Sequence, residues 1–183
     1  MDLINRIKKH YKDNWGDFYE YKFSSAEPIC NLLSEFRILK FNPNQKRNFW
    51  TYATCGMSEH DKTQGLELFI FAPTENDFII KLLIAVADYH ASGYHLGLGH
   101  TINFGCPWYY KSRCDHGLIS LPYLDGTTLE WLKVGNRTIR FLWLIPITVE
   151  EVEYKKKNGL DSLENIFEGI SFNYIDPYRK SVV

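Results

Sequence analysis

Six histidine and cysteine side chains between residues 90 and 116 are the strongest candidates for metal chemistry. Imidazole nitrogens and thiolates are the ligands that zinc prefers, but the chain contains neither C-x-x-C nor H-E-x-x-H. We predict no metal and no cofactor, and we keep a zinc-dependent enzyme using this His/Cys loop as a lesser alternative. The six side chains are those of His90, His95, His100, Cys106, Cys114 and His116.

A cysteine nucleophile would need a nearby histidine base and a lowered thiol pKa. Cys114 is the best candidate, because His116 lies two residues further on and would share its face of an extended strand. The sequence identifies no group to orient this histidine and no oxyanion hole. The glycines between residues 93 and 99 do not fit a phosphate-binding loop either. We therefore predict no catalytic residues and a protein that is not an enzyme.

The composition limits the classes of partner. The 183 residues carry 21 basic and 22 acidic side chains, a net charge of −1, which argues against a polybasic surface for nucleic acid. Apolar runs fall short of the roughly 18 residues that a membrane-spanning helix needs. The first residues do not resemble a secretory signal, and the four cysteines are too irregularly spaced for a disulfide framework. We therefore expect a cytoplasmic protein that binds neither nucleic acid directly nor a membrane.

Hydrophobic periodicity predicts helices at the front, middle and end of the chain. Apolar residues recur on one helical face over residues 2–14. In residues 75–91 they point nearly all round the axis, which is typical of a buried central helix. Two further helices are expected after residue 148, the first ending before Gly159. The expected N-terminal cap pairs are Thr74 with Asp77, Thr148 with Glu151, and Asp161 with Glu164.

Strand patterns fill most of the remaining chain. The segment 66–72 is nearly continuous in apolar residues, which predicts a central strand buried on both faces. A helical turn is expected after Pro28, and a tight turn at residues 135–136. The predicted fold is a single α+β domain with a mixed, largely antiparallel sheet packed against a buried central helix and N- and C-terminal helices. The expected strands are 18–23, 38–41, 49–55, 66–72, 100–104, 118–121, 128–134 and 138–147.

Seven short sequence blocks stand out after residue 50. They are TYATCGMS (51–58), LELFIFAP (66–73), ADYH (87–90), GHTINFG (99–105), IRFLWLIPIT (139–148), NGLDSLENIF (158–167) and DPYRKSV (176–182). In this order they resemble the suppressor-of-fused-like domain family. The resemblance divides the chain into residues 1–47, an N-terminal helix and strand packed on the core, and residues 48–183, the family domain.

The resemblance implies a non-catalytic domain that binds another protein. Animal members of the family hold a transcription factor inactive through a short peptide, whereas many bacterial members resemble immunity proteins that neutralise polymorphic toxins. A single domain of this size resembles the bacterial type, so we expect an immunity protein that occludes a cognate toxin, such as a nuclease domain. The alternative is a peptide-binding regulator that adds a target strand to a sheet edge or a groove. The oligomeric state cannot be predicted from the sequence.

A candidate partner-binding face comes from acidic residues in the last two predicted helices. Inhibitors of nucleases associate faster when an acidic face opposes a basic active site. The expected residues are Glu150, Glu151, Glu153, Glu164 and Glu168.

Other residues match landmarks of the family without implying a catalytic set. Asp176 and Arg179, three residues apart, are expected to pin the C-terminal tail to the domain. The landmark residues, for which a structural role is expected, are Gly99, His100, Asp176, Arg179 and Ser181.

Overall fold

The computed structural model describes residues 2–22, 32, 35–60, 64–170 and 172–183. They form one eight-stranded sheet in the order β1-β2-β3-β4-β8-β6-β5, with β7 paired to β8 outside this path. All pairs are antiparallel except β4 with β8, so the predicted mixed, largely antiparallel α+β fold is confirmed. The elements are α1 (Leu3–Trp15), β1 (Tyr19–Lys22), β2 (Arg37–Phe41), β3 (Trp50–Cys55), η1 (Met57–His60), β4 (Gln64–Ala72), α2 (Asp77–Ala91), β5 (Thr101–Asn103), β6 (His116–Ser120), α3 (Thr127–Glu130), β7 (Trp131–Val134), β8 (Arg137–Ile147), α4 (Val149–Asn158) and α5 (Leu160–Gly169).

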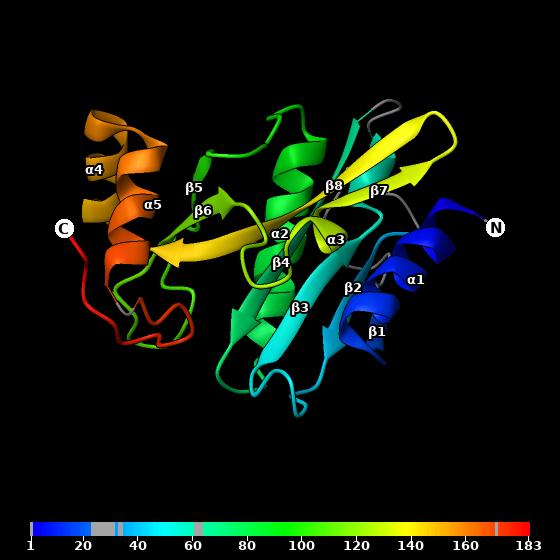
Figure 1. The fold of residues 1–183 in the computed structure, drawn as a ribbon, viewed down its shortest axis with the longest axis horizontal. Helices are drawn as coiled ribbons and strands as arrows, with labels where there is room; N and C mark the ends of the chain where they lie inside the picture. Colours follow the sequence, from blue (N-terminus) through cyan, green and yellow to red (C-terminus); the bar gives the residue numbers. More distant parts are fainter. Residues whose placement is uncertain (1, 23–31, 33–34, 61–63, 171) are drawn as a thin grey trace.

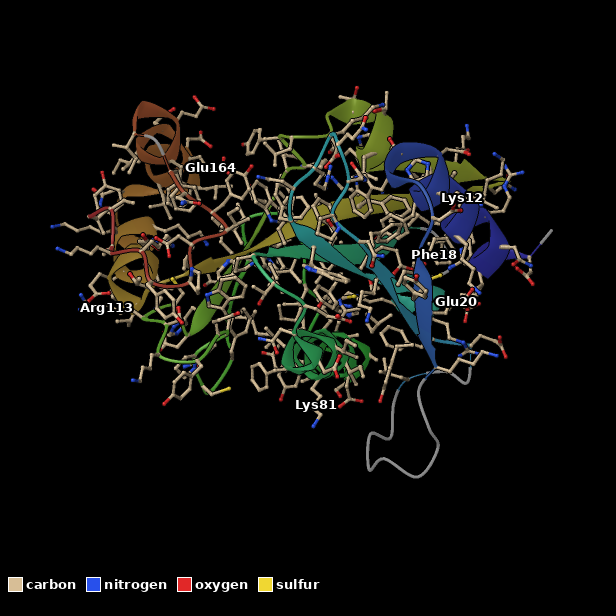
Figure 2. All side chains as sticks on the ribbon, turned by 90° about the horizontal axis from the view of Figure 1, so that it is seen from below. Lys12, Phe18, Glu20, Lys81, Arg113 and Glu164 are labelled. Carbon is tan, nitrogen blue, oxygen red and sulfur yellow. The ribbon has the colours of Figure 1, made fainter. Side chains whose placement is uncertain are left out.

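The central strand β4 is buried on both faces, as its apolar run predicts. Phe69 and Phe71 belong to one hydrophobic core, whereas Leu68 and Ile70 belong to the other. This alternation follows from the two-residue repeat of a strand. The sheet therefore separates two cores, with α2 on one face and α1 and α5 on the opposite face (Figure 2).

The first helix is amphipathic and begins at a side-chain cap. The carboxylate of Asp2 accepts a hydrogen bond from the backbone N–H of Asn5 at 2.8 Å, which satisfies one free donor of the first turn. The apolar stripe that includes Ile7 and Tyr11 is buried against the sheet. Figure 1 shows α1 at one end of the molecule and α4 and α5 at the other, with β8 running between them.

Three local predictions are wrong, each because of backbone geometry. The cap of α2 is Asn76, not Thr74, since its side chain accepts from the N–H of Phe78 at 3.0 Å. Residues 128–134 do not form one strand, because the segment begins with α3, a helical turn that follows Gly126 at a φ of 69°. Asp161 does not cap the last helix: Gly159 alone separates α4 from α5, which leaves Asp161 inside the first turn of α5.

The other elements follow the predictions closely. The capping box at the start of α4 is confirmed, with the side chains of Thr148 and Glu151 each bonded to the other's backbone N–H. The helical turn expected after Pro28 lies outside the described residues. No helix in the described segments is long and apolar enough to cross a membrane.

Candidate functional site

The histidines and cysteines of residues 90–116 do not converge. His90 accepts a hydrogen bond at Nδ1 from the backbone N–H of Leu96 at 3.0 Å, and Nδ1 of His116 lies 2.6 Å from the carboxylate of Asp115. Within the described parts of the chain, no three His, Cys, Asp or Glu side chains form a group that could hold a metal ion. The loop therefore offers no site that would support the zinc alternative.

Cys114 fills core space. Its side chain is buried, and this burial raises the pKa of its thiol to about 11. A thiol with this pKa remains protonated at neutral pH, whereas a nucleophile needs the thiolate. The geometry gives Cys114 a packing role.

Gly99 and His100 act through their backbone. Gly99 has a φ of 78°, and its N–H donates to the carbonyl of Ile119 at 2.7 Å. The carbonyl of Gly99 accepts from the ammonium of Lys155 on α4. The carbonyl of His100 accepts from the N–H of Ile119 at 2.9 Å, while the imidazole is exposed. These contacts attach the chain before β5 to β6 and to α4.

The tail residues hold the C-terminal segment on the domain. Arg179 donates from both terminal nitrogens to Glu151, and its Nη2 also donates to the carbonyl of Pro146 at 2.9 Å. Asp176 accepts from the N–H of Tyr178 at 2.8 Å and shapes the turn before this arginine. Ser181 accepts a long hydrogen bond of 3.4 Å at Oγ from the last N–H of the chain. Of these residues, Arg179 makes the long-range attachment.

One of the five glutamates of the expected acidic face does not lie on the surface. Glu151 is completely buried and serves the capping box and Arg179, so it cannot contact a partner; this part of the prediction is wrong. Glu150 and Glu153 are exposed on α4, where Glu150 pairs with Arg113 at 3.8 Å and Glu153 pairs with Lys156 at 2.8 Å. Glu164 and Glu168 lie on α5, one helical turn apart.

Glu164 and Glu168 border a groove that we call the α5 groove. It has a volume of about 280 Å³. Trp143 and Ile145 of β8 contribute to its lining, together with Phe167 of α5. The other contributors are the connection between β6 and α3 and the segment after α5, and the complete lining is Ser120, Tyr123, Leu124, Trp143, Ile145, Glu164, Phe167, Glu168, Ile170, Phe172 and Tyr174.

The two carboxylates of the α5 groove have different environments. Glu164 accepts hydrogen bonds from the hydroxyls of Ser120 and Tyr123, the latter at 2.9 Å, so both of its oxygens are used. Burial, reinforced by the bond to Glu164, raises the pKa of Tyr123 to about 12. Glu168 is exposed on the next turn of α5. Among the described residues, no Lys, Arg or His lines the groove, so its chemistry is apolar with a negative border.

Sequence reasoning did not find the apolar part of this groove. The sequence feature that could have indicated it is a pair of large apolar residues, Tyr123 and Leu124, between Pro122 and the Asp-Gly pair at 125–126. Turn segments are usually exposed, and these two side chains are indeed 50% and 48% exposed. What the sequence does not show is that both side chains border one cavity.

Known proteins resemble this chain over most of its length. A family model described as Suppressor of fused protein (SUFU) matches residues 33–180. Immunity protein YqcF of Bacillus subtilis is 25% identical over 169 residues, 84% of each chain. An uncharacterized protein of Ureaplasma parvum, UU111, is also 25% identical, over 99% of this chain and 94% of its own.

Solved structures show the same fold. A putative SUFU homologue from Neisseria gonorrhoeae superposes with a TM-score of 0.87 at 30% identity, covering 100% of this chain and 98% of that one. Drosophila Suppressor of Fused superposes with a TM-score of 0.71 at 15% identity, where the match covers 98% of this chain but 50% of the fly protein. At that identity the likeness concerns the fold alone. With a family model matching most of its length and a full-length structural relative, the chain belongs to the suppressor of fused protein (SUFU) family.

Proposed function

We propose that this protein is a non-catalytic immunity protein that neutralises a cognate toxin by binding and covering it. The α5 groove carries the proposal from the structure: it combines apolar side chains and carboxylates. Apolar side chains with a charged border are typical of surfaces that bind another protein. The Bacillus subtilis relative named an immunity protein, which aligns with 84% of this chain, supports the same function.

Charge supports a basic toxin domain, such as a nuclease, as the partner. Glu150, Glu153 and Glu168 are exposed near the α4 and α5 end of the molecule. Carboxylates at one end attract a basic partner and raise its association rate, and binding would release Glu150 and Glu153 from Arg113 and Lys156, with which they pair in the free protein. We infer a cytoplasmic location, because a nuclease toxin would act inside the cell.

Coexpression with a toxin encoded beside this gene tests the proposal. We expect growth of a bacterial host to be restored and the two purified proteins to form a stable complex that blocks toxin activity. The variant Tyr19→Ser is a control that should still neutralise the toxin, since Tyr19 is exposed on β1 at the far end of the sheet from the α5 groove. Undiminished toxicity with a well-folded protein, for every toxin gene found beside this one, would contradict the immunity function.

A second candidate, the peptide-binding regulator, is favoured by the position of β5. This three-residue strand lies at the end of the sheet, and none of its residues is buried. His100 and Phe104 are hydrogen-bonded to β6, and Ile102 pairs with Gly117 between them. Because backbone groups of an antiparallel strand alternate in direction, the N–H of Thr101 points away from β6, toward the free edge of the sheet. Thr101→Pro would therefore abolish strand addition by a partner while leaving the pairing with β6 intact. Unchanged partner binding by this variant would exclude strand addition at β5.

A further inference from the structure

We propose that the α5 groove receives one bulky apolar side chain of the partner and pairs Glu168 with a lysine or arginine beside it. This inference rests on the proposed protein-binding function and specifies the chemistry of the partner segment. Two features of the groove carry it: exposed apolar walls above an aromatic floor, and a carboxylate border without a cation.

The walls expose apolar surface on two sides. Tyr123 and Leu124 lie on one side and Ile170, 44% exposed, lies beyond the end of α5. Exposed side chains of this size occur singly on most surfaces, but here they border one cavity. The volume of about 280 Å³ lies at the lower limit of whole-ligand pockets, roughly 300–1,000 Å³, and suits a single side chain.

The floor of the groove includes the aromatic ring of Trp143. Trp143 is 4% exposed, and its indole Nε1 is buried without a hydrogen-bond partner among the described residues. Buried indole N–H groups usually have a partner. The ring lies between Phe71 and Tyr174, with centroids 4.9 and 5.0 Å away, so a rotation to find another acceptor is blocked by packing. Because this nitrogen is buried, an entering side chain would contact the ring of Trp143 and not its N–H.

The glutamates at the border of the α5 groove favour a positive charge on the partner, next to the apolar side chain that enters the groove. Glu164 and Glu168 are four residues apart on α5 and repel each other at this spacing. Ser120 and Tyr123 compensate Glu164 by donating to it, whereas no salt bridge is formed by Glu168 in the described structure. A cation beside the apolar side chain would neutralise Glu168, and an acidic residue there would be repelled.

The indole resonances of the protein test the inference directly. The full chain, labelled with ¹⁵N, is titrated with acetyl-Phe-Arg-amide, acetyl-Phe-Glu-amide and acetyl-Gly-Arg-amide at millimolar concentrations. The chain has five tryptophans, and Trp143→Phe identifies the resonance of Trp143. Trp131, 47% exposed on β7, is the internal control. We expect the Phe-Arg compound to shift the Trp143 signal at least several times more than the other two compounds, and to leave the Trp131 signal in place.

Two variants assign the effect to the groove. Glu168→Gln should weaken binding of the Phe-Arg compound by about two- to fivefold, the range of an exposed ion pair, and Leu124→Ser should weaken it further. An unshifted Trp143 signal, or equal responses to Phe-Arg and Phe-Glu, would overturn the proposal. So would a dimer that Leu124→Ser dissociates, because a second copy would then occupy the groove.

The two proposals fail separately. If Leu124→Ser and Glu168→Gln lose the peptide response and still neutralise the toxin fully, the partner uses another surface and the immunity function stands. If the Phe-Arg compound binds as expected but no neighbouring toxin is neutralised, the groove chemistry stands and the immunity function fails.

Discussion

Arg179 holds Glu151 in a two-point ion pair inside the protein, with Nη1 2.6 Å from Oε1 and Nη2 2.7 Å from Oε2. The same carboxylate accepts from the backbone N–H groups of Thr148 and Val182. The pair therefore joins the first turn of α4 to the C-terminal tail. Because Thr148 directly follows β8, the central strand, the helix and the tail meet at this carboxylate.

Replacing Arg179 with alanine is expected to destabilise the protein by about 3–5 kcal/mol, because it leaves the Glu151 carboxylate buried without its counterion. Urea unfolding followed by circular dichroism measures the change. The matched control is Lys180→Ala at an exposed neighbour, which should change the free energy of unfolding by less than about 0.5 kcal/mol. Equal stabilities of the two variants would show that the tail is not anchored by the ion pair.

Glu67 should make stability depend on pH in an unusual direction. Burial raises its pKa, although Thr54, Ser58 and the N–H of Gly56 all donate to the carboxylate. With a folded pKa above the unfolded value, the group supports folding fully at low pH and loses this contribution as pH rises through the folded pKa. Glu67→Gln cannot ionise, and its amide can keep bonds to both Thr54 and the backbone donors. We therefore expect its stability relative to the wild type to increase from pH 4 to pH 8.

Urea titrations at both pH values check this expectation, with the exposed Glu168→Gln as control. Glu67→Ala, which removes the acceptor of all these bonds, is expected to lose roughly 3 kcal/mol or more. A constant difference in free energy between wild type and Glu67→Gln at the two pH values would refute the raised pKa.

Asp125 positions the surface turn that carries Leu124. Its Oδ1 accepts from the indole of Trp15 on α1 at 2.8 Å and also contacts Arg47. Asp125→Ala should cost about 2–3 kcal/mol, because this pair is largely buried, and should weaken binding in the α5 groove. Asp13→Ala, which removes an exposed ion pair with Lys9, should change stability by less than about 0.5 kcal/mol. Normal groove binding by Asp125→Ala would show that the turn needs no such anchor.

Thiol labelling distinguishes the packed cysteines from a reactive one. In a Cys30→Ser background, iodoacetamide should label exposed Cys106 in the native protein. Burial raises the pKa values of Cys55 and Cys114, so both should react only after unfolding. Mass spectrometry locates the label. Native labelling of Cys114 as fast as that of Cys106 would reopen the case for a nucleophile.

Association with the proposed basic toxin should slow as salt increases, because exposed carboxylates at the α4 and α5 end steer the encounter. Stopped-flow measurements between 20 and 500 mM NaCl would reveal a decrease of roughly tenfold or more. Glu150→Gln combined with Glu153→Gln should flatten this dependence. A rate that does not change with salt would remove steering from the proposed mechanism.

Local patterns predict much of the fold. The stripe that ends at Trp15, the apolar run of β4 and the capping box at Thr148 each depend on near neighbours in the sequence. The last helix was harder to place, because a single residue, Gly159, both ends α4 and begins α5. A propensity argument assigns such a position to only one helix end.

The site depends on contacts between distant residues, which periodicity does not reveal. The capping pattern marks Glu151 by its spacing from Thr148, but nothing nearby in the sequence shows that Arg179, 28 residues later, pairs with it in the interior. The α5 groove likewise requires β8, α5 and the turn at residues 122–125 to meet. The sequence predicts its glutamates as partner-binding charges but does not predict its apolar floor.

The parallel pairing of β4 with β8 has a consequence for synthesis on the ribosome. β8 lies between β4 and β6, so the strands made from residues 19–72 lack their central neighbour until residues 137–147 emerge. Until then, an unpaired apolar edge of β4 is open to other nascent chains. Slow elongation before residue 137 should therefore increase the dependence of this protein on chaperones.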